Sequence, residues 1–371
     1  MITSSFEQAL SIPKLPQDLT PEFLSAVVNA VHPGITVKRL ELLDVKRYGE
    51  TMVSTSDRLK MQLTFDGRAA ADLPSRVVVK MHRLGDPTLS ELYANEVAFY
   101  VRVRPGLDIE APKVVGGIYD EATFLYYLFL EDLSLRGATF PTALRENSVD
   151  EVWALLAQLA KLHASFWNSP RLRINLAWYQ THLSGSLAAS MDRIVPLAVA
   201  ENIRRSEPVR RIVDALGGDI ALLHAKCRVL QSHQSKLPQT LLHGDCHIGN
   251  TYLLPDGSAG LLDFQLSVLG AWVHDVSYII TTALPVGTRR RHERELLDAY
   301  LEMLAERGAT EPPAREKAWL EYRRALFWNL YVGWLPTPPI NYGDQLASEC
   351  LLRTFTAIED HDTLALLDAL G

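Results

Sequence analysis

The chain has 371 residues, of which 47% are hydrophobic, so it can bury a sizeable core, most simply as two lobes. Its formal net charge of −7 argues against a protein that coats nucleic acid or an anionic membrane. Cys227, Cys246 and Cys350 are too widely spaced for a zinc motif or a disulfide framework. No secretory signal and no run of about 18 apolar residues occurs, so we expect a cytoplasmic protein with neither a membrane nor a nucleic-acid partner.

The first predicted element is a helix that Thr20 can cap and that begins with Pro21. From residue 36 the composition changes to segments rich in β-branched, aromatic and leucine residues. These segments predict strands at 36–45, 59–65, 76–81 and 124–130, interrupted by one helix from about 87 to 101. The pattern divides this part of the chain into a helical leader, 1–33, and a small N-lobe, 34–131.

The remainder, 132–371, is predicted to form a larger and mainly helical C-lobe. Ser148 and Glu151 have the spacing of a capping box, and the helix they open carries apolar residues at helical spacing. Two short strands around Leu241 and Leu261 carry polar motifs, and prolines break the helical pattern near residue 337. The fold class is therefore α+β, with a small sheet lobe preceding a helical lobe.

The polar motifs indicate phosphoryl transfer. Residues 243–250 read His-Gly-Asp-Cys-His-Ile-Gly-Asn, and Asp263-Phe264 ends the apolar run that follows. Asp245 is the candidate base that receives the proton of an acceptor hydroxyl, while Asn250 and Asp263 supply the hard oxygen ligands that Mg²⁺ prefers. Each residue alone could be an ordinary turn or cap residue; the spacing of all three favours catalysis.

Neighbouring residues of the motif are expected to have supporting roles. Residues 243–250 are called the catalytic loop below. We predict that His243 and Asp275 hold this loop by hydrogen bonds, and that Cys246 is a small buried side chain. His247 could contact a phosphate or Asp245, or be a plain loop histidine.

Lys80 ends the predicted strand at 76–81, where an ammonium group could reach the α- and β-phosphates of a nucleotide. Glu96 lies on the single helix of the sheet region and is its expected ion-pair partner, with Glu91 as the competing candidate. A solvated strand-end lysine beside a surface glutamate is the alternative.

Two further segments could contact a nucleotide. The loop 49–55 contains one glycine, and Ser54 could hold phosphate there, although an ordinary hairpin loop would look the same. Between the lobes, the Glu131 carbonyl and the Leu133 N–H could hydrogen-bond the edge of an adenine ring; a bare linker is the alternative.

With these residues assembled, the chain resembles the aminoglycoside phosphotransferase and choline kinase superfamily, and within it most closely the ecdysteroid-kinase-like group. The resemblance rests on Glu-Asp-Leu at 131–133, on residues 159–167, on 243–250 and on Leu-Asp-Phe-Gln at 262–265. It implies a bilobal protein-kinase-like fold, ATP with Mg²⁺, and phosphorylation of a hydroxyl group on a small molecule. Gln265 stands where protein kinases have the glycine of Asp-Phe-Gly, and no activation-loop pattern follows, which disfavours a protein substrate.

The acceptor pocket is expected in the helical lobe, from the region 172–236 and the carboxy-terminal helices. The segment 322–342 is crowded with aromatic residues that are either core or pocket: Tyr322, Phe327, Trp328, Tyr331, Trp334 and Tyr342. If they line the pocket, they favour a partly apolar acceptor or a quaternary cation. Polycationic aminoglycosides would instead need carboxylates such as Glu349, Glu359 and Asp360.

Two other functions compete with a small-molecule kinase. One is a catalytically inactive nucleotide-binding protein of the same fold, although the set Lys80, Asp245, Asn250 and Asp263 is intact. The other is a metal-dependent hydrolase whose ligands would be His243, Asp245 and His247.

Overall fold

The computed structural model describes residues 11–46, 56–67, 70–82, 90–338 and 341–371. It divides into two compact units, one of Met1–Gly106 with Pro112–Leu135 and one of Leu107–Ala111 with Arg136–Gly371. The first unit thus contains the segment expected to be a separate leader and most of the segment expected to be the N-lobe, without Leu107–Ala111. In the described part of the chain, no helix combines the length and apolar character needed to cross a membrane.

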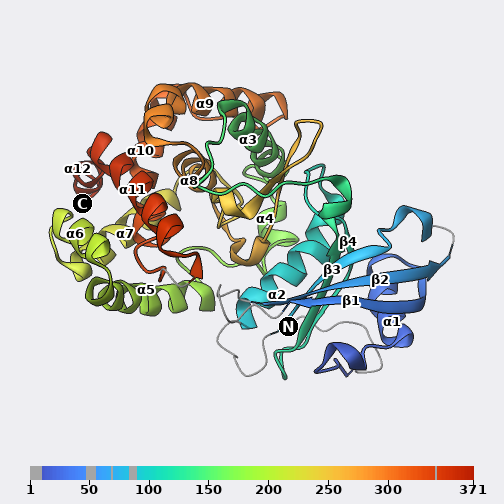
Figure 1. Ribbon diagram of the computed structural model, residues 1–371. Helices are drawn as coiled ribbons and strands as arrows, with labels where there is room; N and C mark the ends of the chain where they lie inside the picture. Colours follow the sequence, from blue (N-terminus) through green and yellow to red (C-terminus); the bar gives the residue numbers. More distant parts are fainter. Residues whose placement is uncertain (1–10, 47–55, 68–69, 83–89, 339–340) are drawn as a thin grey trace. The chain divides into compact units, whose positions relative to one another are not determined.

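The first unit is built around a five-stranded antiparallel sheet in the order β1-β2-β3-β5-β4. Its elements are α1 (Pro21–Val31), β1 (Thr36–Lys46), β2 (Asp57–Asp66), β3 (Arg76–Met81), α2 (Ser90–Ala98), β4 (Val114–Tyr119) and β5 (Tyr126–Glu131). Thr20 caps α1 as predicted, accepting a hydrogen bond from the Phe23 N–H. The buried face of α1 shares one hydrophobic core with the sheet, which explains why the leader is not a separate element (Figure 1).

The alternation of side chains along β3 determines on which face of the sheet Lys80 lies. Val77, Val79 and Met81 belong to the core beneath α1. Successive side chains of a strand face opposite sides of the sheet, so Lys80 faces the other side. There it meets α2, whose Glu96 is fully buried.

Two features of this unit differ from the sequence prediction. The helix continues beyond α2 as a π-helical turn, Phe99–Val103, and ends near Pro105. Strand β4 was not predicted because its central residues are Gly116 and Gly117, which have low strand propensity. A Cβ at Gly117 would lie 2.9 Å from a Val101 methyl carbon, so glycine lets the π-helical turn pack closely against the sheet.

The second unit is mainly helical, with two small antiparallel strand pairs, β6-β9 and β7-β8. Its strands are β6 (Gln239–Leu241), β7 (Thr251–Leu253), β8 (Ala259–Leu261) and β9 (Leu269–Ala271). Its helices are α3 (Val149–Ala164), α4 (Arg171–Ile174), α5 (Ser186–Arg205), α6 (Glu207–Ala215), α7 (Ile220–Gln234), α8 (Val273–Ala283), α9 (Val286–Glu306), α10 (Arg315–Tyr331), α11 (Asp344–Asp360) and α12 (Thr363–Asp368).

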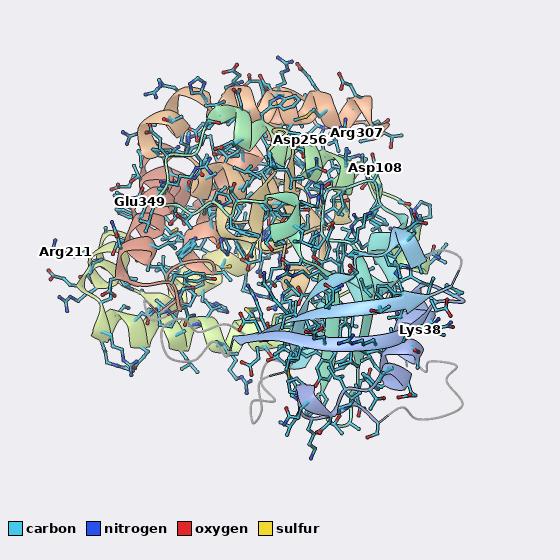
Figure 2. All side chains as sticks on the ribbon, turned by 45° about the vertical axis from the view of Figure 1, so that its right-hand side comes forward. Lys38, Asp108, Arg211, Asp256, Arg307 and Glu349 are labelled. Atoms are coloured by element: carbon cyan, nitrogen blue, oxygen red, sulfur yellow. The ribbon has the colours of Figure 1, made fainter. Side chains whose placement is uncertain are left out.

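Helix α8 forms the centre of this unit, because every one of its residues is buried. It packs against α10 and α3, and α3 lies along α9 (Figure 1). The capping box predicted at the start of α3 is present in both directions, between Ser148 and Glu151. Charged side chains such as Lys38 on β1 and Arg211 on α6 project outward from their elements, as Figure 2 shows.

Candidate active site

The pairing of β7 with β8 brings the two polar motifs together. Thr251 is paired with Leu261, so Asn250, just before β7, lies opposite Leu262. The Leu262 N–H donates to the Asn250 carbonyl at 2.8 Å, and Asp263 is the next residue. Asn250 and Asp263 are 13 residues apart in the sequence, and one short hairpin brings them close together.

Asn250 is fixed by Asp245. Its Nδ2 donates to the Asp245 carbonyl oxygen at 2.9 Å and to the Asp245 carboxylate oxygen Oδ2 at 3.0 Å. Because the amide is planar, this arrangement turns Oδ1 away from Asp245 and presents it as an oxygen ligand. The structure thus brings together three of the predicted site residues, Asp245, Asn250 and Asp263.

The electrostatics of this group favour a cation. Burial, together with the negative charge of Asp263, raises the pKa of Asp245 to about 8, although the hydrogen bond from Asn250 opposes the rise. Two carboxylates and an amide oxygen around one space are hard donors of the kind that hold Mg²⁺. A divalent cation there would offset the repulsion between the carboxylates and favour their ionised forms.

Two residues of the motifs adopt left-handed backbone conformations. Gly244 has a φ of 84°, and a Cβ at this position would lie 1.9 Å from the Leu266 carbonyl oxygen. Asp263 has φ 61° and ψ 66°, an uncommon conformation for a residue with a side chain. The close approach at Gly244 requires glycine, which explains this residue of the motif.

His243 ties the two motifs to each other, as predicted. Its Nδ1 accepts a hydrogen bond from the Asp245 N–H at 3.3 Å, which leaves the proton on Nε2. Nε2 then donates to the carbonyl oxygen of Leu262 at 2.6 Å. The ring is buried and packs against Phe264, with ring centroids 4.5 Å apart.

Asp275 holds the catalytic loop from α8, which confirms its predicted supporting role. Its carboxylate accepts from the His243 N–H at 2.7 Å and from the Gly244 N–H at 2.9 Å. His163 of α3 donates to the same carboxylate at 3.1 Å, and its other nitrogen bonds the Tyr300 hydroxyl of α9 at 2.7 Å. Burial alone would raise the pKa of Asp275, but the hydrogen bond and charge of His163, with those of nearby histidines, hold it at about 2.

Sequence reasoning missed two further contacts to this loop. His274 bonds the Gly244 carbonyl at 3.0 Å, and the Thr282 hydroxyl accepts from the Ile248 N–H at 3.2 Å. Both residues lie on α8, one beside Asp275 and the other two turns further along. A helical wheel through Asp275 would have placed them near the loop, but it would not have shown which loop groups they bond.

The surroundings of His247 and Cys246 do not suit either side chain for a direct role in phosphoryl transfer. The His247 Nδ1 accepts from the Gly249 N–H at 3.1 Å, while Nε2 lies 3.9 Å from the Asp245 carboxylate, beyond hydrogen-bond reach. Burial lowers the pKa of His247 to about 4, so the ring is neutral near pH 7. Cys246 is fully buried, as predicted, and burial raises the pKa of its thiol.

The geometry counts against the hydrolase alternative. Among the residues with described placement, no group of three histidine, cysteine, aspartate or glutamate side chains could hold a metal ion. Both nitrogens of His243 are engaged by backbone groups, and Nδ1 of His247 is engaged as well.

In the first unit, Lys80 and Glu96 form the predicted ion pair, with Nζ 2.6 Å from Oε1. The side chains are 7% and 0% exposed, so this is a buried pair and not a solvated surface contact. Glu96, and not Glu91, is therefore the partner. Ser54 lies outside the described residues.

The segment joining the sheet to the following turn is held by other residues of the first unit. Glu131 pairs with Val77 of β3, and its side chain accepts from the Lys113 N–H at 3.2 Å. Leu133 opens a 3-10 turn, Leu133–Arg136, and its side chain is buried. Between them, the buried carboxylate of Asp132 lies 3.0 Å from the Lys60 ammonium and 3.5 Å from the Arg76 guanidinium.

A cavity of about 220 Å³ in the second unit adjoins the catalytic loop, with Gly244, Asp245 and His247 in its wall. Most of its other wall residues come from the regions in which the acceptor pocket was expected, whereas Leu266, Val268 and Tyr278 lie outside them. Four of the six aromatic residues in 322–342 line it: Trp328, Tyr331, Trp334 and Tyr342. Tyr322 and Phe327 are fully buried and belong to the core.

The carboxylates considered for an aminoglycoside do not line this cavity. Glu349 accepts from Arg353 at 2.7 Å, and Asp360 is bonded to Arg289 and Arg290. Glu359 instead lines a separate pocket with Asp362 and Thr363.

Known proteins that are similar to this chain indicate its family and fold. The family model described as a phosphotransferase enzyme family matches residues 66–316. A search of curated protein sequences finds no match to this chain.

Among solved structures, choline kinase from Cryptosporidium parvum Iowa II is similar at a TM-score of 0.54 and 10% identity, covering 89% of this chain and 93% of that one. Plasmodium vivax ethanolamine kinase is similar at a TM-score of 0.50 and 11% identity, covering 90% and 83%. These similarities confirm the predicted α+β, protein-kinase-like fold. Because the family model spans more than half of the chain, this chain belongs to the phosphotransferase enzyme family, within the aminoglycoside phosphotransferase and choline kinase superfamily.

Proposed function

We propose that this phosphotransferase moves the terminal phosphoryl group of ATP to a hydroxyl group of a small molecule. The observation that carries the proposal is the convergence of Asp245, Asn250 and Asp263 beside a cavity in the second unit. Asp245 is the one member of this group that lines the cavity, so it can meet an acceptor hydroxyl.

Asp245 would act as the base. As the acceptor oxygen forms its bond to the γ-phosphorus and the bond to the β–γ bridging oxygen breaks, the hydroxyl proton passes to the Asp245 carboxylate. Asn250 keeps that carboxylate oriented through its Nδ2. His243 and Asp275 hold the loop that carries it.

Asn250 Oδ1 and the Asp263 carboxylate would hold Mg²⁺, which when bound neutralises charge on the phosphates. Lys80, fixed by Glu96, would bind phosphate oxygens of the nucleotide. Ser54 and the backbone of Glu131 and Leu133 complete the proposed nucleotide contacts. A cytoplasmic location and the narrower likeness to the ecdysteroid-kinase-like group stay predictions.

The test is a screen of hydroxylated compounds with ATP and Mg²⁺, read by mass spectrometry. We expect at least one acceptor to gain the mass of one phosphoryl group, with one ADP formed for each product molecule. Binding of ATP with no product from any acceptor would favour the inactive nucleotide-binding alternative. Hydrolysis of compounds without ATP would favour the hydrolase.

A further inference from the structure

We propose that the acceptor is an uncharged alcohol with an apolar body, and that Arg228 sets this selectivity by neutralising Asp192 in the cavity wall. The inference rests on the proposed function, because it takes the cavity beside Asp245 as the acceptor site. It goes further by naming the class of substrate and a residue that determines specificity.

The cavity offers little negative charge to a cationic acceptor. Among its described wall residues, Asp192 of α5 and Asp245 are the only carboxylates. Asp245 is assigned to the reacting hydroxyl, so a cationic group elsewhere on the acceptor would have to pair with Asp192.

Asp192 already has cationic and polar neighbours. The Arg228 Nη1, on α7, lies 3.3 Å from Oδ1 of Asp192, and the His224 Nε2 lies 3.5 Å from the same oxygen. Arg228 is also anchored to the wall, because Nη1 donates to the His182 carbonyl at 3.2 Å and to Gln231 Oε1 at 3.1 Å. An acceptor cation would therefore compete with a tethered guanidinium.

The rest of the wall gives an apolar molecule surface to pack against and adds no further negative charge. Trp328, Tyr331 and Trp334 supply aromatic surface. His182 also lines the cavity, and burial together with the nearby His274 lowers its pKa to about 3, so its ring is uncharged near neutral pH.

The experiment compares shape-matched alcohols that differ only in charge. The first pair is 3,3-dimethylbutan-1-ol and choline; the second adds a phenylene ring, as 2-(4-tert-butylphenyl)ethanol and its trimethylammonium counterpart. Binding to the full chain is measured by calorimetry without nucleotide, so that the result does not depend on phosphoryl transfer. We expect the neutral member of at least one pair to bind about tenfold more tightly than its cationic counterpart.

Two substitutions should change the ratio of the affinities for the neutral and the cationic alcohol in opposite directions. Arg228→Gln exposes the charge of Asp192 and should favour the cation about threefold to tenfold, a modest change because both side chains are partly exposed. Asp192→Asn leaves the positive charge of Arg228 beside the cavity wall without its carboxylate partner and should disfavour the cation further. The double variant should return close to the wild-type ratio, and circular dichroism checks that each variant folds.

Tighter binding of the cations by the wild type, or no saturable binding of either neutral alcohol, would overturn the inference. So would an unchanged ratio in folded Arg228→Gln and Asp192→Asn variants. The proposed function is tested separately, because a cation that is phosphorylated by ATP would uphold the kinase and reject the uncharged acceptor. Neutral alcohols that bind but are never phosphorylated would support the uncharged acceptor and count against the kinase.

Discussion

Lys80 and Glu96 show how one buried pair can serve both structure and binding. The carboxylate is fully buried and the ammonium nearly so, at a separation of 2.6 Å. Forming such a pair costs desolvation free energy, so it is weak evidence for a purely stabilising role. A phosphate-binding role explains better why a charged pair occupies this position.

Replacing Lys80 with methionine should therefore have two effects. It removes the ammonium partner of a buried carboxylate, which should lower the free energy of unfolding by about 3–5 kcal/mol. It should also raise the KM for ATP at least about tenfold, because a phosphate contact is lost. Denaturant unfolding and steady-state kinetics measure the two effects.

The double variant Lys80→Met with Glu96→Leu separates the effect on stability from the effect on ATP binding. It removes both charges, so stability should largely recover while the KM for ATP stays high. Recovery of both stability and ATP use would show that the lysine only balances the charge of Glu96.

At the scale of elements, the catalytic loop depends on its contact with the segment that follows Asp263. Gly244 meets the Leu266 carbonyl at a distance that leaves no room for a Cβ. His243 bonds the Leu262 carbonyl a few residues earlier. The loop that carries Asp245 and the segment 262–266 are thus packed backbone to backbone.

Gly244→Ala should separate these two segments and lower turnover at least about a hundredfold, since displacement of catalytic groups by about 1 Å has effects of that size. Gly257→Ala is the matched control. Gly257 also has a φ of 84° but has open space around it, so alanine there carries only the backbone cost of about 1–2 kcal/mol. Thermal unfolding and turnover are measured for both, and equal losses of turnover would contradict the packing argument.

The elements that sequence alone predicts are those with a local physical signal. The capping residues of α1 and α3 and the apolar alternation of β3 act within a few residues, and the structure confirms them. Strands β7 and β9 are only three residues long and carry little periodicity. Strand β7 exists because β8 pairs with it across a short hairpin, and β9 exists because β6, far earlier in the chain, pairs with it. Neither pairing is visible in the pattern of the short strand itself.

At the scale of the whole molecule, Asp275 links several elements of the second unit. It lies on α8, bonds the catalytic loop, and is reached by His163 of α3, which in turn bonds Tyr300 of α9. Both Asp275 and His163 are fully buried. The position of the loop is therefore coupled to the packing of three helices.

This linkage predicts a pH dependence of stability. The pKa of Asp275 is about 2 in the folded chain and about 3.9 in an unfolded one, so its contribution is complete above pH 4 and lost as the pH falls toward 2. Asp275→Asn should be less stable than the wild type at pH 5, and the difference should shrink by about 2 kcal/mol by pH 2. Urea unfolding at a series of pH values measures this, and a constant difference would contradict the assigned role.

The candidate site was only partly predictable, because some of its contacts join residues that are far apart in the sequence. Asp245, Asn250 and Asp263 were identified because their spacing is fixed by one loop and one hairpin. The cavity wall takes Asp192, His224 and Trp328 from three helices, and the first and last of these residues are more than 130 positions apart in the chain. No local sequence pattern indicates which of their side chains meet. Whether the aromatic residues of 322–342 were core or pocket could be decided only by the packing of α10.

The most direct test of the account is the effect of Asp245→Asn on transfer and on nucleotide binding, measured on the same preparation. With an acceptor from the screen, we expect turnover to fall by about 10²–10⁴-fold, because the proton acceptor is lost. The Kd for ATP should change by less than about threefold, and Asp256→Asn in the exposed turn between β7 and β8 serves as the control. Near-normal turnover by folded Asp245→Asn protein would contradict the central claim that this carboxylate accepts the hydroxyl proton.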